Sequence, residues 1–172
     1  KQIVQLEEGV PIRENPAKLL AAELKDKLIL VYGGGLFTGM ARRWKTQLNE
    51  NAKVWAFFET IPELLHNAVE SYGTTEGPGS RLMVLLLQPK VDEGDAGPHY
   101  QVVSQLLGQN AVLNHILRGE ATHPLSQLLA MLLLGDYVSY YLALLRGVDP
   151  SPMPAIQAAK EGLARLLPKD AN

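Results

Sequence analysis

The sequence predicts an α/β protein built on a mostly parallel sheet, and two features of the chain support this prediction. Short apolar runs without polar alternation are typical of strands that are buried on both faces. Segments with apolar residues at helical spacing separate these runs. This order favours strand–helix–strand units with right-handed crossovers, in which ligands bind beyond the carboxyl ends of the strands. The strands are expected at residues 28–32, 54–58, 82–87 and 111–117.

The helices are predicted from caps, spacing and breaks. Asn15 suits the N-cap of the first helix, and Pro16 suits its first turn. The prolines in residues 149–154 exclude a continuous helix there. The start of the chain, before Pro16, has no clear period and predicts an irregular entry. Helices are expected at residues 16–27, 37–48, 62–71, 99–107, 123–146 and 155–167, and loops at 49–51, 74–80 and 90–98.

Composition excludes several classes of protein. With 172 residues, 47% hydrophobic and 20% charged, the chain is expected to form one compact domain rather than a disordered segment. The net charge of −2 gives no electrostatic signature of nucleic acid or of an anionic membrane as a partner. The absence of Cys excludes disulfides, thiolate metal sites and Cys nucleophiles, and it fits a cytoplasmic location.

The most apolar segment, residues 125–145, is nearly long enough to cross a bilayer. It contains Gln127, Asp136 and Ser139, and an ionised carboxylate is costly at the centre of a membrane. A buried or interface helix is therefore expected, with no membrane as a partner. Because the segment is apolar around most of its circumference, it needs cover on more than one side, and we expect an obligate protein partner. Lys1 follows no Met and no signal-peptide pattern is present, which suggests a soluble piece of a longer polypeptide.

The chemistry is expected within residues 28–67. The first strand ends in three glycines, residues 33–35, where the backbone can turn sharply and direct N–H groups at an anion. The triplet matches neither nucleotide-binding glycine motif, so a strand-to-helix turn is the favoured interpretation. Further along, Glu50 lies between two asparagines in residues 49–51, which we call the NEN segment. The glycines and the NEN segment are both expected at the carboxyl edge of the sheet.

Taken alone, each polar candidate also has a simpler interpretation. Glu50 suits a solvated turn, His66 a histidine that bonds the backbone, and Lys160 one charge on an amphipathic helix. The remaining histidines do not have the spacing of a metal-ligand set, so we assign them structural roles and expect no metal. These histidines are His99, His115 and His123.

Two longer stretches are specific enough to suggest a family. RRWKTQLNENAKVWAFFETIPELLHN, followed much later by GDYVSYYLALLRGVDPSPMPAIQAAK, resembles the C-terminal half of the bifunctional phosphoglucose/phosphomannose isomerases, a branch of the sugar isomerase (SIS) superfamily. The resemblance runs from about Leu28 to Leu167, and it is the combination of motifs that makes it specific.

The resemblance implies a flavodoxin-like SIS fold with three αβα layers, and a single SIS domain over residues 1–172. It implies an enzyme that isomerises glucose 6-phosphate or mannose 6-phosphate to fructose 6-phosphate through a cis-enediol, without metal or cofactor. Such carbohydrate-derivative-binding isomerases act in glycolysis and gluconeogenesis in the cytoplasm. Family members are homodimers, and they carry a companion N-terminal SIS domain that has no counterpart here. This piece alone is therefore expected to be inactive.

The resemblance also assigns residues. The catalytic base of the family corresponds to Glu50, its ring-opening histidine to His66, supplied to the neighbouring subunit, and its terminal-helix lysine to Lys160. A carboxylate can carry a proton between neighbouring carbons, imidazole titrates near neutrality, and a cation stabilises an enediolate. Candidate substrate-binding residues are Gly34, Gly35, Asn51 and Ser151.

Departures from the family pattern leave alternatives open. The family usually has Ser-Gly at residues 33–35, and a Trp-Asn-Glu-Phe type of segment at residues 58–61. Both changes affect substrate contacts rather than the three catalytic matches. A non-catalytic SIS domain that senses a sugar phosphate is one alternative, and another phosphosugar isomerase, including a glucosamine-6-phosphate type, is the other.

Overall fold

The computed structural model describes residues 2–73, 81–90 and 97–167, so the loop predicted at 74–80 and most of that at 90–98 lie outside the described residues. Its centre is a parallel sheet in the order β2-β1-β3-β4. The strands are β1 (Leu28–Gly34), β2 (Ala56–Ile61), β3 (Leu82–Gln88) and β4 (Leu113–Arg118). The predicted strands and the α/β class are thus confirmed.

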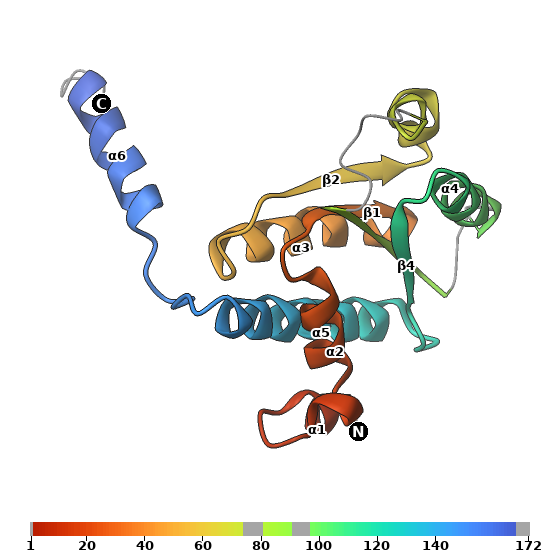
Figure 1. The fold of residues 1–172 in the computed structure, drawn as a ribbon, viewed down its shortest axis with the longest axis horizontal. Coiled ribbons are helices and arrows are strands. Elements are labelled where there is room, and N and C mark those ends of the chain that lie inside the picture. Colours follow the sequence, from red (N-terminus) through yellow and green to blue (C-terminus); the bar gives the residue numbers. More distant parts are fainter. Residues whose placement is uncertain (1, 74–80, 91–96, 168–172) are drawn as a thin grey trace.

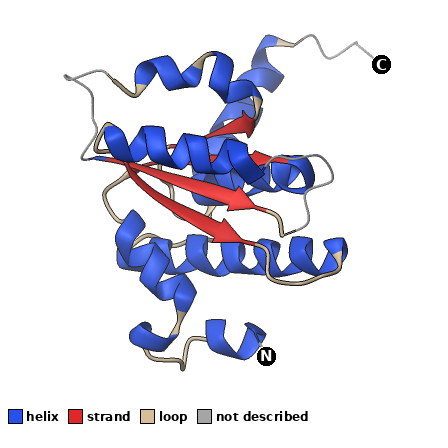
Figure 2. Cartoon of the chain, turned by 90° about the vertical axis from the view of Figure 1, so that its right-hand side faces the viewer, coloured by secondary structure: helices blue, strands red, loops and turns tan. Residues whose placement is uncertain are grey.

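Helices cover both faces of the sheet and form three layers (Figures 1 and 2). One face is covered by α2 (Pro16–Leu24), α3 (Thr38–Glu50) and α5 (Pro124–Leu145). The other is covered by α4 (Gly97–Gln109) and two short 3-10 helices, η3 (Glu63–His66) and η4 (Ala68–Ser71). The remaining elements are α1 (Gln2–Leu6), η1 (Ile12–Glu14), η2 (Gly35–Phe37) and α6 (Pro154–Leu166).

Two hydrophobic cores form because successive strand residues point to opposite faces. In β1, Ile29 and Val31 pack on the side of α2, α3 and α5, whereas Tyr32 packs on the side of α4. In β3, Leu85 and Leu86 divide between the two sides in the same way. Burial on both faces accounts for the continuous apolar runs in these strands.

The glycine triplet spans the end of β1 and the start of the connection to α3. A Cβ at Gly33 would lie 2.5 Å from the carbonyl oxygen of Phe37, and one at Gly34 would lie 2.6 Å from that of Ile61. Gly35 has a φ of 53°, in the left-handed region that favours glycine. Close packing and backbone conformation therefore account for all three glycines.

Helix α5 is the most apolar element, and of the described residues it alone is long and apolar enough to cross a membrane. It packs against α2 and α3 within the body. A Cβ at Gly135 would lie 2.5 Å from the indole nitrogen of Trp44, which donates a hydrogen bond of 2.9 Å to the carbonyl of Met131. These contacts indicate a core helix. Several of its leucines remain exposed, namely Leu125, Leu129, Leu144 and Leu145.

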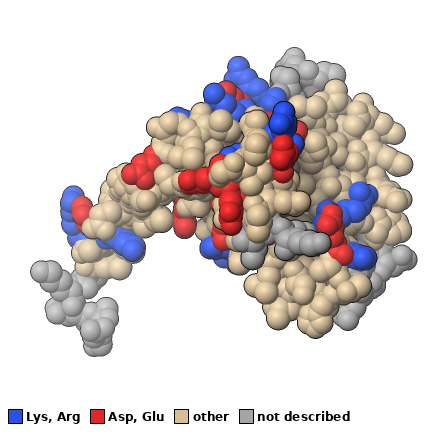
Figure 3. Space-filling model, turned by 90° about the horizontal axis from the view of Figure 1, so that it is seen from below, with Lys and Arg blue, Asp and Glu red and all other residues tan. Residues whose placement is uncertain are grey.

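Helix α6 projects away from the body (Figure 1), and no residue in it is buried. Its apolar side chains are open to solvent, with exposed fractions of 57% for Leu163 and 84% for Leu166. Figure 3 shows acidic and basic side chains interspersed on the face seen from below, with broad uncharged areas on the body.

Three local predictions were wrong. The helix expected at 62–71 is two 3-10 turns, because Asn67 (φ −146°, ψ −64°) interrupts it and its side chain accepts from the Ala68 N–H to start the second turn. Asn49 and Glu50 belong to the last turn of α3, not to a loop. The irregular entry contains the short helix α1.

Candidate functional site

The NEN segment lies at the amino edge of the sheet, so its predicted place at the carboxyl edge was wrong. The glycine turn lies at the carboxyl edge, where β1 ends and α3 begins. Helix α3 has 13 residues, about 20 Å at 1.5 Å per residue, which is close to the length of a strand. It therefore runs the full depth of the sheet and delivers Glu50 to the opposite edge.

Asparagine side chains fix the backbone on both sides of Glu50. The Asn49 amide donates to the carbonyl of Val54 at 2.8 Å, which ties the end of α3 to the entry of β2. The Asn51 amide donates to the Ser139 hydroxyl at 2.9 Å, and this hydroxyl donates to the Asp136 carbonyl. The two stretches that carry the family resemblance therefore meet at this contact.

A third contact brings the proline-rich segment to the same corner. The Lys53 ammonium donates to the carbonyl of Glu50, to that of Pro152 at 2.9 Å and to that of Pro150 at 3.3 Å. Ser151 lies between these prolines, exposed, and its N–H donates to the Asp149 carboxylate in a turn. Sequence reasoning did not single out Lys53. Its only signal was the Ala-Lys pair after the NEN segment.

Glu50 at this corner is half-buried. Among the hydrogen bonds and ion pairs between described residues, its carboxylate oxygens take part in none; its backbone carbonyl takes the bond from Lys53. A fixed backbone and an unpaired carboxylate are what a proton-transferring base requires. The corner with Glu50, Asn51 and Ser151 is the candidate site.

His66 lies at the other end of the sheet. It ends η3, which follows the carboxyl end of β2, and it is exposed. Strand β2 has six residues, so about 20 Å of strand separates the entry near Glu50 from the exit toward His66. Figure 1 shows the α3–β2 connection and the short helices after β2 at opposite ends of β2. One chain does not bring these two side chains together.

Lys160 lies on α6, a helix that begins near the corner of Glu50 and carries the lysine away from it. Helix α6 leaves the body after Pro152, and Lys160 is six residues beyond its first residue, about 9 Å along the axis. Its ammonium has no hydrogen-bond or ion-pair partner among the described residues. In the part of the chain that the structure describes, it is an exposed charge without a partner.

Gly34 and Gly35 lie with His66 at the carboxyl edge. The Gly34 N–H donates to the Tyr100 hydroxyl at 2.7 Å, and this hydroxyl donates to the carbonyl of Leu87 at 2.7 Å. Tyr100 thus fills the gap between the ends of β1 and β3. Packing explains Gly34 and backbone conformation explains Gly35, and their role in binding a substrate stays a prediction.

The comparisons with known proteins decide the family. A family described as the bacterial phospho-glucose isomerase C-terminal SIS domain matches residues 13–163. The chain belongs to this family. This SIS domain is 31% identical over 160 residues to the bifunctional phosphoglucose/phosphomannose isomerase of Aquifex aeolicus, covering 93% of the chain and 50% of the relative. It is 33% identical over 162 residues to the enzyme of the same name from Caldicellulosiruptor bescii, covering 91% and 47%.

The fold comparison agrees. A glucose-6-phosphate isomerase like protein from Thermus thermophilus superposes with a TM-score of 0.71 at 27% identity, over 88% of this chain and 51% of that one. This SIS domain therefore spans about half the length of the relatives that it matches. The predicted SIS fold and family are confirmed.

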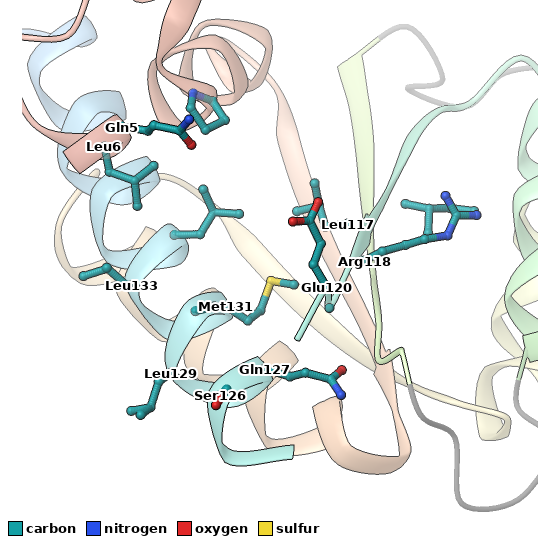
Figure 4. Close-up of a pocket in the computed structure, with 15 residues that line it drawn as sticks. Gln5, Leu6, Leu117, Arg118, Glu120, Ser126, Gln127, Leu129, Met131 and Leu133 are labelled. Carbon is teal, nitrogen blue, oxygen red and sulfur yellow. The ribbon is translucent and has the colours of Figure 1, made fainter. Parts of the chain in front are cut away.

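Two cavities in this SIS domain lie away from the candidate residues. One of about 660 Å³ lies between the N-terminal segment, the end of β4 and α5, with Leu117, Met131 and Gln127 in its wall (Figure 4). The other, about 370 Å³, adjoins Tyr140. Neither is lined by Glu50, His66 or Lys160. The candidate site is therefore separate from both of these cavities.

Two of the remaining histidines, His115 and His123, make contacts that suit a structural role. His115 lies 2.5 Å from the Glu23 carboxylate, and His123 caps α5 by accepting from the Leu125 N–H. In the described part of the chain, no three His, Asp or Glu residues are grouped as metal ligands.

Proposed function

We propose that this SIS domain supplies the C-terminal half of the active site of an isomerase that converts glucose 6-phosphate or mannose 6-phosphate to fructose 6-phosphate. The names of its relatives support this reaction. The observation that carries the assignment is the half-buried Glu50, whose carboxylate has no partner among the described residues and which lies between two anchored asparagines where both family stretches meet.

In this proposal Glu50 takes the proton from C2 of the opened aldose and returns it to C1 of the cis-enediol. A single carboxylate above both carbons suffices, because the same group receives and donates the proton. The bonds of Asn49 and Asn51 hold the backbone on both sides of Glu50, so little reorganisation accompanies the transfer. Asn51 and Ser151 border the same corner and would contact sugar hydroxyls.

His66 opens the sugar ring, and it comes from a second subunit. The length of β2 separates Glu50 from His66 by far more than the size of a hexose, so a shared sugar needs the imidazole of another molecule. A symmetric homodimer would build two such sites. The dimer, like the cytoplasmic location and the place in glycolysis and gluconeogenesis, belongs to the proposal.

The companion N-terminal SIS domain completes the site by holding most of the phosphate. The length of the relatives supports its presence. Lys160 shares one face of α6 with Ile156 and Leu163, at spacings of four and three residues. Covering this apolar face with the companion domain or a second subunit would bring Lys160 to the developing enediolate.

The test is Glu50→Gln in the full-length protein, assayed with both hexose 6-phosphates in the presence of a chelator. We expect turnover to fall by roughly three orders of magnitude or more while ligand affinity is kept, because only the proton transfer is lost. Glu14→Gln is the matched control. It makes the same change at an exposed glutamate before α2, away from the corner that holds Glu50, and should keep full activity.

Other outcomes would contradict the proposal. Unchanged turnover in Glu50→Gln removes Glu50 as the base. A folded wild-type protein that binds hexose phosphates and converts neither favours the non-catalytic sensor, and conversion of other phosphosugars alone favours a different isomerase. Activity that the chelator abolishes excludes the metal-free mechanism.

A further inference from the structure

We infer that Lys53 is a positioning residue that locks the catalytic turn to the proline-rich segment, and this inference rests on the proposed function. Its ammonium carries three N–H donors, and three carbonyl oxygens accept from it. They belong to Glu50, Pro150 and Pro152, so one side chain joins segments almost a hundred residues apart in the sequence.

The position of this ammonium suits the end of a helix. The last carbonyls of a helix lack intrahelical partners, and the helix dipole places partial negative charge there. Lys53 satisfies the carbonyl of Glu50 itself, in the last turn of α3. It therefore fixes the backbone from which the proposed base extends.

On the other side, Lys53 fixes the point where α6 leaves the body. Prolines at 150 and 152 cannot donate backbone hydrogen bonds, so that segment offers mainly carbonyls. No residue of α6 is buried, so the helix itself adds little to this attachment. Lys53 thus sets the spacing between Glu50 and Ser151, and the origin of the helix that carries Lys160.

The backbone shows that the side chain matters here. Lys53 has a φ of 54°, a conformation in which glycine would be more favourable. The turns before β1 and β4 use the same region at Asp26 (φ 62°) and Ala111 (φ 56°). Ala111 shows that such a turn forms without a long side chain, so turn formation does not explain the lysine.

The ammonium is engaged by carbonyls and is therefore not a substrate-binding cation. Substituting it should change the geometry of the site rather than remove a contact to the sugar. A misplacement of about 1 Å in a catalytic constellation costs up to about 100-fold in rate.

The test compares Lys53→Gly, Lys53→Met and Lys53→Arg in the full-length protein. Lys53→Gly keeps the turn, since glycine suits a positive φ, so we expect an unchanged or higher melting temperature with a kcat lower by between about 10- and 100-fold and a smaller change in KM. Lys53→Met should lose kcat similarly, and Lys53→Arg, which keeps a cationic donor, should recover most of it. Hydrogen exchange at residues 153–157 should quicken in the first two variants.

Asp26→Gly, the same change at the corresponding turn before β1, is the matched control and should leave kcat unaltered. If Lys53→Gly keeps wild-type kcat while Glu50→Gln is inactive, the positioning role is wrong and the proposed function stands. If neither Lys53→Gly nor Glu50→Gln loses activity, the proposed function itself is wrong. If Lys53→Gly lowers the melting temperature and this loss of stability accounts for its lower kcat, the inference is also overturned.

Discussion

At the scale of single residues, the environment of the proposed base is defined by neighbours that do not touch its carboxylate. Asn49, Asn51 and Lys53 all bond backbone or hydroxyl groups around Glu50. This leaves the carboxylate free to accept a proton while its backbone is held from three directions. In the proposed function the two asparagines of the NEN segment therefore position Glu50, and Glu50 transfers the proton.

Asp136 provides a test of the electrostatics next to this corner. Burial raises the pKa of its carboxyl above the ordinary value, and Arg43, 3.6 Å away, only partly opposes this shift. Folding therefore favours the protonated form, and the contribution of Asp136 to stability is lost as pH rises from the ordinary Asp pKa through the raised one.

Asp136→Asn removes this titration. We expect the unfolding free energy of the variant, relative to wild type, to increase as pH rises from the ordinary Asp range to neutrality. Urea unfolding of both proteins, once at a pH near the ordinary Asp pKa and once at neutral pH, measures this difference. If the unfolding free energy of the variant relative to wild type decreases as pH rises, the Arg43 ion pair outweighs burial.

At the scale of elements, the strand-to-helix turn after β1 depends on glycine for packing. Gly33→Ala would place a methyl 2.5 Å from the Phe37 carbonyl, a backbone atom that cannot rotate away. We expect a loss of about 2–3 kcal/mol in unfolding free energy, measured by denaturant titration.

Gly39→Ala is the matched control for this prediction. Gly39 lies in α3 with no atom within 4 Å of a Cβ, so alanine should raise stability by about 0.5 kcal/mol through helix propensity. Equal effects of the two substitutions would mean that the turn can open and that the packing explanation is incorrect.

The elements were largely predictable from the sequence, and their ends were not. Apolar runs predicted β1, β2 and β3, and an alternation of apolar and polar residues predicted β4; the runs in β1 and β3 reflect burial on both faces. The polar NEN segment was interpreted as a loop, since composition does not reveal that α3 continues through Glu50. The predicted edge was wrong for a separate reason, since in a parallel strand–helix–strand unit the connection from the helix to the next strand lies at the amino edge, whether or not the helix includes Glu50.

The candidate site was only partly predictable for a related reason. Glu50, Asn51 and Ser151 were chosen from motifs, and the fold gathers them at one corner. Lys53 was missed because its positive φ and its reach to Pro150 and Pro152 depend on tertiary structure. The separation of Glu50 from His66 likewise follows from strand length and topology, which a motif does not contain.

At the scale of the whole molecule, the proposed companion domain or second subunit would dock on exposed apolar surface. Helix α6 exposes Ile156, Leu163 and Leu166 along its length. We expect Leu163→Glu in the full-length protein to lower turnover at least tenfold and to speed proteolysis within α6, because a charge would oppose docking of this face. Kinetic assays and limited proteolysis measure both effects.

Ala158→Glu is the control, since Ala158 is exposed two residues before Lys160 and away from the apolar face. It adds the same charge and should leave both readouts unchanged. If Leu163→Glu matches this control, α6 does not dock through its apolar face.

The central claim is that each site joins Glu50 of one subunit to His66 of another, and mixing two inactive variants tests it directly. Full-length Glu50→Gln and His66→Asn proteins, each inactive alone, are dissociated and reassociated together. Random pairing in a symmetric dimer should restore about a quarter of wild-type activity, because half of the dimers hold one intact site. No recovered activity, with mixed dimers verified by mass spectrometry, would contradict the shared site.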